Sequence, residues 1–212
     1  MCIRDRKEFK KGRMQILSEL TKLRQLCCDP ALVYENYEGG SAKLDLCIEL
    51  IQSAVESGHK ILLFSQFTSM IEILTARLQE ESISYFVLQG STKKEQRAQM
   101  VEQFNRDDTS VFCISLKAGG TGLNLTGADI VIHYDPWWNV AVENQATDRA
   151  HRIGQKNVVT VYKLIAKGTI EEKIIKLQQR KKELAEEILS GDEIKTASFQ
   201  REELLELLEE RF

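Results

Sequence analysis

The sequence predicts an α/β fold, in which a mostly parallel sheet lies between two helical layers (α/β/α) and further helices flank the domain. Two observations predict it. Between residues 42 and 165, short apolar or β-branched runs alternate with segments whose apolar residues recur at helical spacing, a pattern typical of a parallel sheet covered by helices. The chain also has 212 residues, 42% of them hydrophobic, which suffices for one such domain with appendages or for two small domains.

Five apolar runs are predicted to be strands buried on both faces. They cover residues 61–64, 85–88, 111–114, 130–132 and 158–165. Between the first two runs, apolar residues at helical spacing predict a helix near residues 67–78. After the second run, Thr92 and Glu95 have the spacing of a capping box, which predicts a helix towards Phe104.

Helices are also predicted on both sides of this region. An apolar stripe at helical spacing precedes Asp29-Pro30, and it consists of Ile16, Leu20, Leu23 and Cys27. Residues 37–41 contain a Gly-Gly pair and indicate a linker, so the predicted boundaries are 1–40 for a helix and linker, 41–168 for the domain, and 169–212 for C-terminal helices. Thr169 and Glu172 form a second predicted capping box. Residues 1–6 match no pattern around them and are compatible with a cloning scar.

Composition excludes several classes of protein. No uncharged apolar run approaches the roughly 18 residues of a membrane helix. The five cysteines form no CxxC pair and the three histidines are isolated, so we predict buried thiols and no metal site. Ten Lys or Arg against two acids occupy residues 149–182, and ten acids against three bases occupy residues 183–212. The basic stretch has two open interpretations, which are solvated helix faces and a phosphate-facing surface.

Polar residues follow four of the predicted strands. They are Ser65-Gln66, Gln89 to Thr92, Ser115 to Gly122, and Tyr134 to Pro136. Hydroxyls, amides and glycine N–H groups can hydrogen-bond a phosphodiester without reading bases. For residues 119–122 alone, a turn with positive φ is an equally good interpretation. The four polar ends together favour phosphate binding, because ligands of open α/β sheets bind beyond the carboxyl ends of the strands.

A P-loop is the competing interpretation of the glycine-rich region. Gly122 and Gly127 have the spacing of the two glycines in GxxxxGK[ST], but Ala128 and Asp129 follow them. Without a lysine for the phosphates and a hydroxyl for Mg²⁺, this loop cannot bind a nucleotide in the P-loop manner.

Residues 139–154 predict a helix capped by Asn139, with Gln145, Arg149 and Arg152 on one face. Two interpretations are open. Asp148 and Arg152 have the i, i+4 spacing of a surface ion pair, whereas guanidinium groups also suit the charge of a transferring phosphoryl group, as arginine fingers do. The neighbouring Trp pair at 137–138 is more typical of a hydrophobic anchor than of a base-stacking site.

Four segments together resemble helicase motifs IV, IVa, V and VI. They are Ile61–Phe67 (ILLFSQF), Leu88–Thr92 (LQGST), Ser115–Asn124 (SLKAGGTGLN) and Gln145–Gln155 (QATDRAHRIGQ). On these motifs the sequence resembles the second RecA-like lobe, a P-loop NTPase-like domain, of Swi/Snf-type ATPases in helicase superfamily two. The resemblance covers residues 14–212 and implies a motor that hydrolyses ATP between two lobes and tracks along double-stranded DNA.

The resemblance assigns expected roles by motif position. Arg149 and Arg152 are the expected catalytic arginines. The expected nucleotide-binding residues are these two and Gly120, Gly122 and Gln145. The expected DNA-binding residues are Ser65, Gln66, Gly90, Ser91, Thr92, Lys117, Gly119, Thr121 and Asn124. Val140 stands where the family often has Pro, which affects only the start of that helix.

The expected cofactors are ATP and Mg²⁺, which the resemblance assigns mainly to a first lobe that is absent from this sequence. Residues 1–40 would be the end of that lobe. We therefore expect the chain alone neither to hydrolyse ATP nor to translocate. The expected partners are double-stranded DNA, the first lobe and a protein at the acidic tail, with no membrane, in a cytoplasmic, nucleoid-associated or nuclear location.

Two other functions remain open. One is a stand-alone nucleic-acid-binding or docking module without ATPase activity. The other is an RNA helicase lobe, which is less expected because Gly154-Gln155 stands where that group normally has a Gly-Arg unit.

Overall fold

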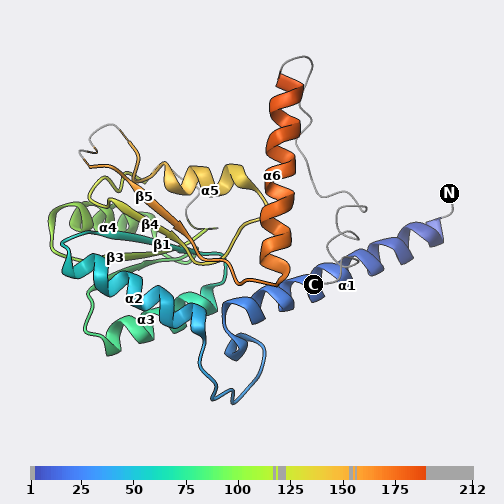
Figure 1. The fold of residues 1–212 in the computed structure, drawn as a ribbon, viewed down its shortest axis with the longest axis horizontal. Helices are drawn as coiled ribbons and strands as arrows, with labels where there is room; N and C mark the ends of the chain where they lie inside the picture. The colour runs from blue at the N-terminus through green and yellow to red at the C-terminus, as the bar shows by residue number, and fades with distance from the viewer. Residues whose placement is uncertain (1–2, 117, 119–122, 153–154, 156, 190–212) are drawn as a thin grey trace.

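The computed structural model describes residues 3–189 except 117, 119–122, 153–154 and 156. Five strands form one sheet with helices on both faces, and two longer helices lie at one end of it (Figure 1). The helical elements are α1 (Ile3–Cys28), the 3₁₀ helix η1 (Pro30–Leu32), α2 (Ala42–Glu56), α3 (Thr68–Glu80), α4 (Lys94–Arg106), α5 (Val140–Thr147) and α6 (Ile170–Leu189). The strands are β1 (Ile61–Ser65), β2 (Tyr85–Leu88), β3 (Val111–Ser115), β4 (Ile130–His133) and β5 (Thr160–Lys163).

The sheet has the order β2-β3-β1-β4-β5, and every neighbouring pair is parallel. The predicted α/β/α fold class is therefore confirmed. The prediction of burial on both faces is correct for β1, β3 and β4. It is wrong for β2, of which only Leu88 is buried, and for β5, whose four residues are all exposed, because these two strands lie at the edges of the sheet.

Alternate side chains of the central strands enter two separate cores. Ile61 and Leu63 of β1 pack with α2 and α3 on one face. Leu62 and Phe64 pack with α4 and α5 on the other. This alternation follows from the two-residue period of a strand, and it places helices below and above the sheet in Figure 1.

The helix starts agree only in part with the capping predictions. Asn139 accepts a hydrogen bond from Ala141 N, as an N-cap does. At α6 the Thr169 hydroxyl accepts from Glu171 N, and the Glu172 carboxylate accepts from Gly168 N, one residue before the expected position. The capping box at Thr92 is wrong. Lys93 precedes α4 without a side-chain cap, because the Thr92 hydroxyl instead accepts from Gln89 N.

The helix predicted over 139–154 is shorter than expected. α5 ends at Thr147, and the chain continues through turns at Arg149 and Arg152. Gln145, Arg149 and Arg152 therefore do not share one helical face, and that prediction is wrong. Arg149 instead points into the protein, whereas Gln145 and Arg152 are exposed.

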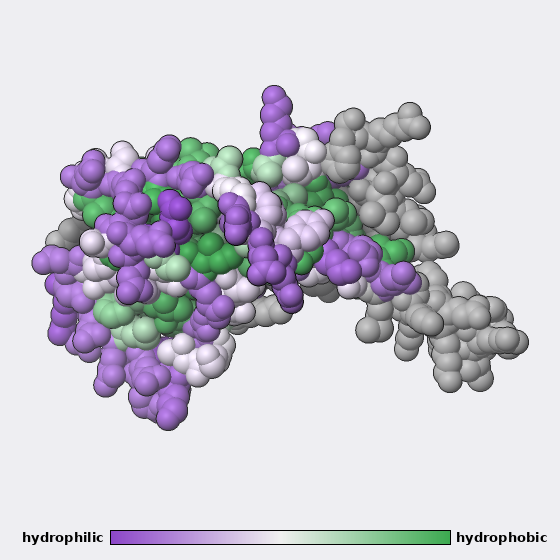
Figure 2. All heavy atoms as spheres, turned by 90° about the horizontal axis from the view of Figure 1, so that it is seen from below, coloured by the Kyte–Doolittle hydropathy of each residue, from purple (hydrophilic) through white to green (hydrophobic). Residues whose placement is uncertain are grey.

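The two long helices pack against each other at one end of the sheet. Leu20 of α1 is buried together with Ile170, Ile174 and Leu177 of α6. Leu23 belongs to the predicted apolar stripe of α1 but is 40% exposed. Viewed from below, the surface is largely hydrophilic with apolar areas between the charged side chains (Figure 2).

Two further predictions concern the surface. Within the described part of the chain, no helix is long and apolar enough to cross a membrane. The basic stretch 149–182 does not form one continuous surface, because Arg149 and Lys173 are buried and Lys163 binds the buried carboxylate of Glu143 at 2.6 Å.

Candidate nucleotide and DNA interface

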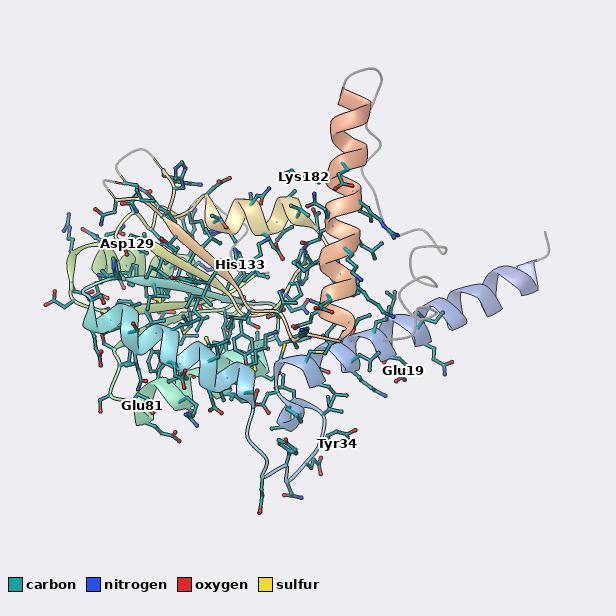
Figure 3. The ribbon with its side chains drawn as sticks, in the orientation of Figure 1. Glu19, Tyr34, Glu81, Asp129, His133 and Lys182 are labelled. Atoms are coloured by element: carbon teal, nitrogen blue, oxygen red, sulfur yellow. The ribbon has the colours of Figure 1, made fainter. Side chains whose placement is uncertain are left out.

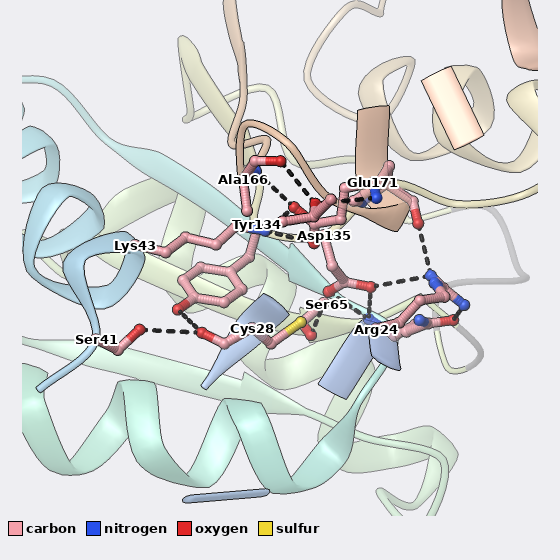
Figure 4. Close-up of polar contacts among 12 residues, drawn as sticks. Arg24, Cys28, Ser41, Lys43, Ser65, Tyr134, Asp135, Ala166 and Glu171 are labelled. Carbon is pink, nitrogen blue, oxygen red and sulfur yellow. Dashed lines mark hydrogen bonds and ion pairs between the residues drawn. The ribbon is translucent and has the colours of Figure 1, made fainter. Parts of the chain in front are cut away.

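The carboxyl ends of β1 and β4 meet in a buried polar network around Asp135. The Ser65 hydroxyl donates to Asp135 Oδ1 at 2.6 Å, and Gln66 N donates to the same oxygen at 3.2 Å (Figure 4). Ser65 is 0% exposed. In this structure the Ser65 side chain is therefore inaccessible to a phosphate, and its hydroxyl is hydrogen-bonded within the network around Asp135.

Arg24 of α1 completes this network. Its guanidinium is 3% exposed, donates to Gln66 Oε1 at 2.9 Å and to the Pro136 carbonyl at 2.6 Å, and lies 3.6 Å from Asp135 Oδ2. Three aromatic rings also face it, and they belong to Phe67, Trp137 and Trp138. Burial lowers the pKa of Arg24 and raises that of Asp135, and each charge opposes the shift of the other.

The Trp pair thus acts as an anchor around Arg24, as the hydrophobic interpretation expected. Sequence reasoning missed Arg24 and Asp135 themselves. A signal for Arg24 existed, because it stands four residues after Leu20 and four before Cys28, both of which are buried. A cation inside a buried helical stripe indicates an internal partner.

A second set of contacts attaches the flanking helices to the same end of the sheet. Lys43 binds the buried carboxylate of Glu171 at 2.6 Å, and this carboxylate also accepts from Ala166 N (Figure 4). The Tyr134 hydroxyl donates to the carbonyl of Cys28. These contacts fix α1, α2 and α6 relative to the carboxyl edge of the sheet.

Arg97 of α4 holds two of the polar loops together. Its guanidinium donates to the carbonyls of Gln89, Gly90 and Thr92 after β2, and to the carbonyl of Ala118 after β3. Sequence reasoning missed Arg97. Its four acceptors are all backbone groups, which carry no sequence signal.

The expected DNA-binding residues fall into three groups. Gly90, Ser91 and Asn124 are exposed, and a Cβ added at Gly90 would meet no atom within 4 Å. Gln66 and Thr92 are half-buried and already hydrogen-bonded. Lys117, Gly119 and Thr121 lie outside the described residues, as do the expected nucleotide-binding residues Gly120 and Gly122.

Arg149 is a buried cation of a different kind. It is 4% exposed, and its Nε and Nη1 atoms have no hydrogen-bond partner in the described part of the chain. Burial, together with the nearby positive charge of Arg152, lowers its pKa to about 10. Such a site suits an anionic ligand, because a phosphate would supply both the missing acceptors and the opposite charge.

His133 is the last residue of β4 and is buried, and Asp129 directly precedes the first residue of this strand (Figure 3). The His133 ring stacks on Phe64, and its Nε2 is 3.0 Å from Thr147 Oγ1. Burial lowers the pKa of His133 to about 4, so this ring is neutral at pH 7.

No metal site was found among the described residues, since no three His, Cys, Asp or Glu side chains there are grouped to hold an ion. The site thus offers donors for phosphate oxygens. Among these residues it offers no carboxylate cluster for Mg²⁺.

The all-parallel sheet, with helices on both faces and polar loops at its carboxyl edge, has the architecture of a RecA-like lobe. A family model described as "Helicase conserved C-terminal domain" matches residues 42–154. The chain belongs to this family and is a C-terminal lobe of the Swi2/Snf2 ATPase type.

Three similar proteins illustrate the relationship. An "Uncharacterized ATP-dependent helicase" of Mycoplasma pneumoniae is 45% identical over 94% of this chain and 19% of its own length. The "SWI2/SNF2 ATPase C-terminal domain" of Sulfolobus solfataricus has a TM-score of 0.72 and 34% identity, over 94% of this chain and 83% of that one. The "SWI2/SNF2 ATPase core in complex with dsDNA" of the same organism has a TM-score of 0.71 and 37% identity, over 85% and 38% of the two chains. This chain thus spans about one fifth of the length of the curated helicase.

Proposed function

We propose that this chain is the second motor lobe of an ATP-dependent translocase that moves along double-stranded DNA. In this proposal a first lobe binds most of the ATP and the Mg²⁺, and the chain presents Arg149 and Arg152 to the nucleotide across the lobe interface. The names of these relatives support the use of ATP, and they support double-stranded DNA as the polymer along which the protein moves.

The state of Arg149 carries the proposal. A buried cation without a carboxylate partner destabilises a protein, because burial removes hydration that nothing in the fold replaces. Such an arrangement is typical of functional sites. A guanidinium with two unpaired nitrogens can donate to the oxygens of a transferring phosphoryl group, which is the role of an arginine finger.

The DNA side of the proposal rests on the loop after β2 and on Asn124, in the segment between β3 and β4. Arg97 fixes the backbone of residues 89–92 against Ala118, so the exposed Ser91 hydroxyl belongs to a pre-ordered loop. Asn124 is exposed beyond β3, at the end of the expected motif V. Contacts of this type bind the phosphodiester backbone and carry no base sequence, as a translocase requires.

The proposal is tested in the full polypeptide encoded by the gene that carries this chain. The ATPase rate is measured with and without duplex DNA in the parent, in Arg149→Gln and in the control Arg106→Gln, whose side chain is 77% exposed. We expect duplex DNA to raise the parental rate. Arg149→Gln should lower the stimulated rate about 10³-fold or more, and the control should change it less than about twofold.

Two results would contradict the proposal. An Arg149→Gln rate close to the parental rate would exclude the finger role. A gene product without ATPase activity that still binds duplex DNA would instead favour the docking-module function. The 212-residue chain alone, assayed in parallel, is expected to show no ATPase activity.

A further inference from the structure

The segment after the expected DNA-contacting loop lies directly against Arg149. The amide of Leu125 donates to the Arg149 carbonyl at 3.1 Å, and the amide of Ala128 donates back to Leu125 O at 3.2 Å. Leu125 is buried, whereas Asn124 before it is exposed. A backbone hydrogen bond therefore joins the loop that would meet DNA to the arginine that would meet the nucleotide.

One half-buried side chain holds these two segments together. The Gln155 amide nitrogen donates to the carbonyl of Ala128 at 2.6 Å and lies within 3.3 Å of the Thr126 and Ala150 carbonyls. Its amide oxygen accepts from Asn157 N at 2.9 Å. A carboxamide is required here, because it supplies donors on one atom and an acceptor on the other.

The position of the Arg149 guanidinium depends on these backbone contacts. Nε and Nη1 of Arg149 have no partner in the described part of the chain, so hydrogen bonds do not hold those atoms in place. Where the guanidinium points is then set by the backbone at Arg149 and Ala150. Both of these residues are attached to the 125–128 segment, one through Leu125 N and the other through Gln155.

We propose that Gln155 is a positioning residue that couples DNA contact at Asn124, the residue before Leu125, to the placement of Arg149. This inference rests on the proposed function and assigns it a coupling element. A displacement of residues 124–128 on DNA would move the Ala128 and Ala150 carbonyls together, because the Gln155 amide nitrogen bridges them. Gln155 itself would touch neither DNA nor nucleotide.

Gln155→Glu tests the proposal in the full polypeptide. The variant keeps the shape and the acceptor oxygen for Asn157 N, but it replaces the donor with an oxygen that repels three carbonyls. We expect DNA stimulation, the ratio of kcat with and without duplex, to fall by between about fivefold and 150-fold. KM for ATP, unstimulated kcat and Kd for duplex DNA should each stay within about twofold, since the contact groups remain.

The same substitution at an exposed position provides the matched control. Gln99→Glu on α4 adds the same charge away from these contacts and should leave the stimulation unchanged. A protonated carboxyl regains one donor, so the defect of Gln155→Glu should shrink as the pH falls from about pH 8 to about pH 6, relative to the parent at each pH. In the 212-residue chain, Gln155→Glu should also speed amide hydrogen exchange at Leu125.

The outcomes separate this inference from the function on which it rests. An unchanged stimulation ratio in Gln155→Glu, or an equal loss of stimulated and unstimulated kcat, would overturn the coupling role while leaving the translocase intact. A parent that duplex DNA does not stimulate would overturn the proposed function and the coupling role with it.

Discussion

Arg24 and Arg149 are both buried arginines, and Nε of each has no hydrogen-bond partner among the described residues, but the charges around them differ. Each is less than 5% exposed, and burial lowers the pKa of each. Arg24 faces the Asp135 carboxylate, two further acceptors and three aromatic rings. Arg149 has two unpartnered nitrogens among the described residues, and the charge that acts on it most is another arginine, Arg152.

The fold compensates the charge of Arg24, whereas the charge of Arg149 suits an anionic ligand. Removing one partner of a compensated buried pair leaves the other charge unpaired and is strongly destabilising. Removing an uncompensated buried cation takes away a charge that already costs stability. The two arginines should therefore respond in opposite directions to the same substitution.

The largest expected effect on stability is at Arg24. Arg24→Met should lower the free energy of unfolding of the 212-residue chain by about 3–5 kcal/mol, because Asp135 would remain buried without its counter-charge. Urea unfolding at pH 7 measures it. Lys22→Met on the same helix is the control and should stay within about 1 kcal/mol, since its ion pair with Glu19 is exposed. If Arg24→Met lowered the free energy of unfolding no more than Lys22→Met does, the contrast between Arg24 and Arg149 would be wrong.

The next largest expected effect is the pH dependence of stability that is due to His133. Its folded pKa is about 4, below the unfolded value near 6.5, so the unfolded chain binds the proton first. The contribution of neutral His133 to the free energy of unfolding is therefore fully present above about pH 6.5. It is lost as the pH falls towards 4, and the full loss is about 3 kcal/mol. Glu143 opposes this depression of the pKa and Lys163 adds to it.

Urea unfolding at several pH values in this window measures the His133 effect. His133→Asn should flatten the slope of stability against pH, and His151→Asn at an exposed position should not. Equal slopes in the two variants would show that His133 is not the group that titrates.

The smallest effect, and the one of opposite sign, is at Arg149. Arg149→Met should leave the unfolding free energy of the 212-residue chain unchanged or raise it by about 1 kcal/mol, since an unpaired buried charge is removed. Thermal and urea unfolding beside Arg24→Met make the contrast direct. A loss of several kcal/mol would mean that Arg149 is part of the fold, as Arg24 is.

Much of the fold was predictable because strands and helices have distinct apolar periods. All five strands and the helices α3, α4 and α5 were predicted from residues 42–165, whereas α2 was not predicted as a separate helix. The exposure of β5 had a partial local signal, because Thr160 and Lys163 make this strand more polar than the central strands β1 and β3. The end of α5 at Thr147 gave no local signal, since no Gly or Pro stands there.

The site was predictable only as far as its motifs. Arg149 was identified by spacing and resemblance, but its burial and its unpaired nitrogens depend on the fold around it. Ser65 was expected at DNA, yet the partner that buries its hydroxyl, Asp135, is distant in sequence. Pairings such as Arg24 with Asp135 arise from topology, and periodicity carries no information about them.

The strand order also governs how the chain can fold as it is synthesised. The central strand β1 pairs Ile61 with Val111 of β3 and with Ile130 of β4, both far downstream, while the next strand in sequence, β2, does not touch it. A nascent chain therefore displays the apolar Ile61–Phe64 run without a sheet partner until β3 has left the ribosome. A run of this kind is prone to aggregate while it waits. Mutations that slow β3 pairing should reduce soluble yield during synthesis more than they reduce the stability of the finished protein.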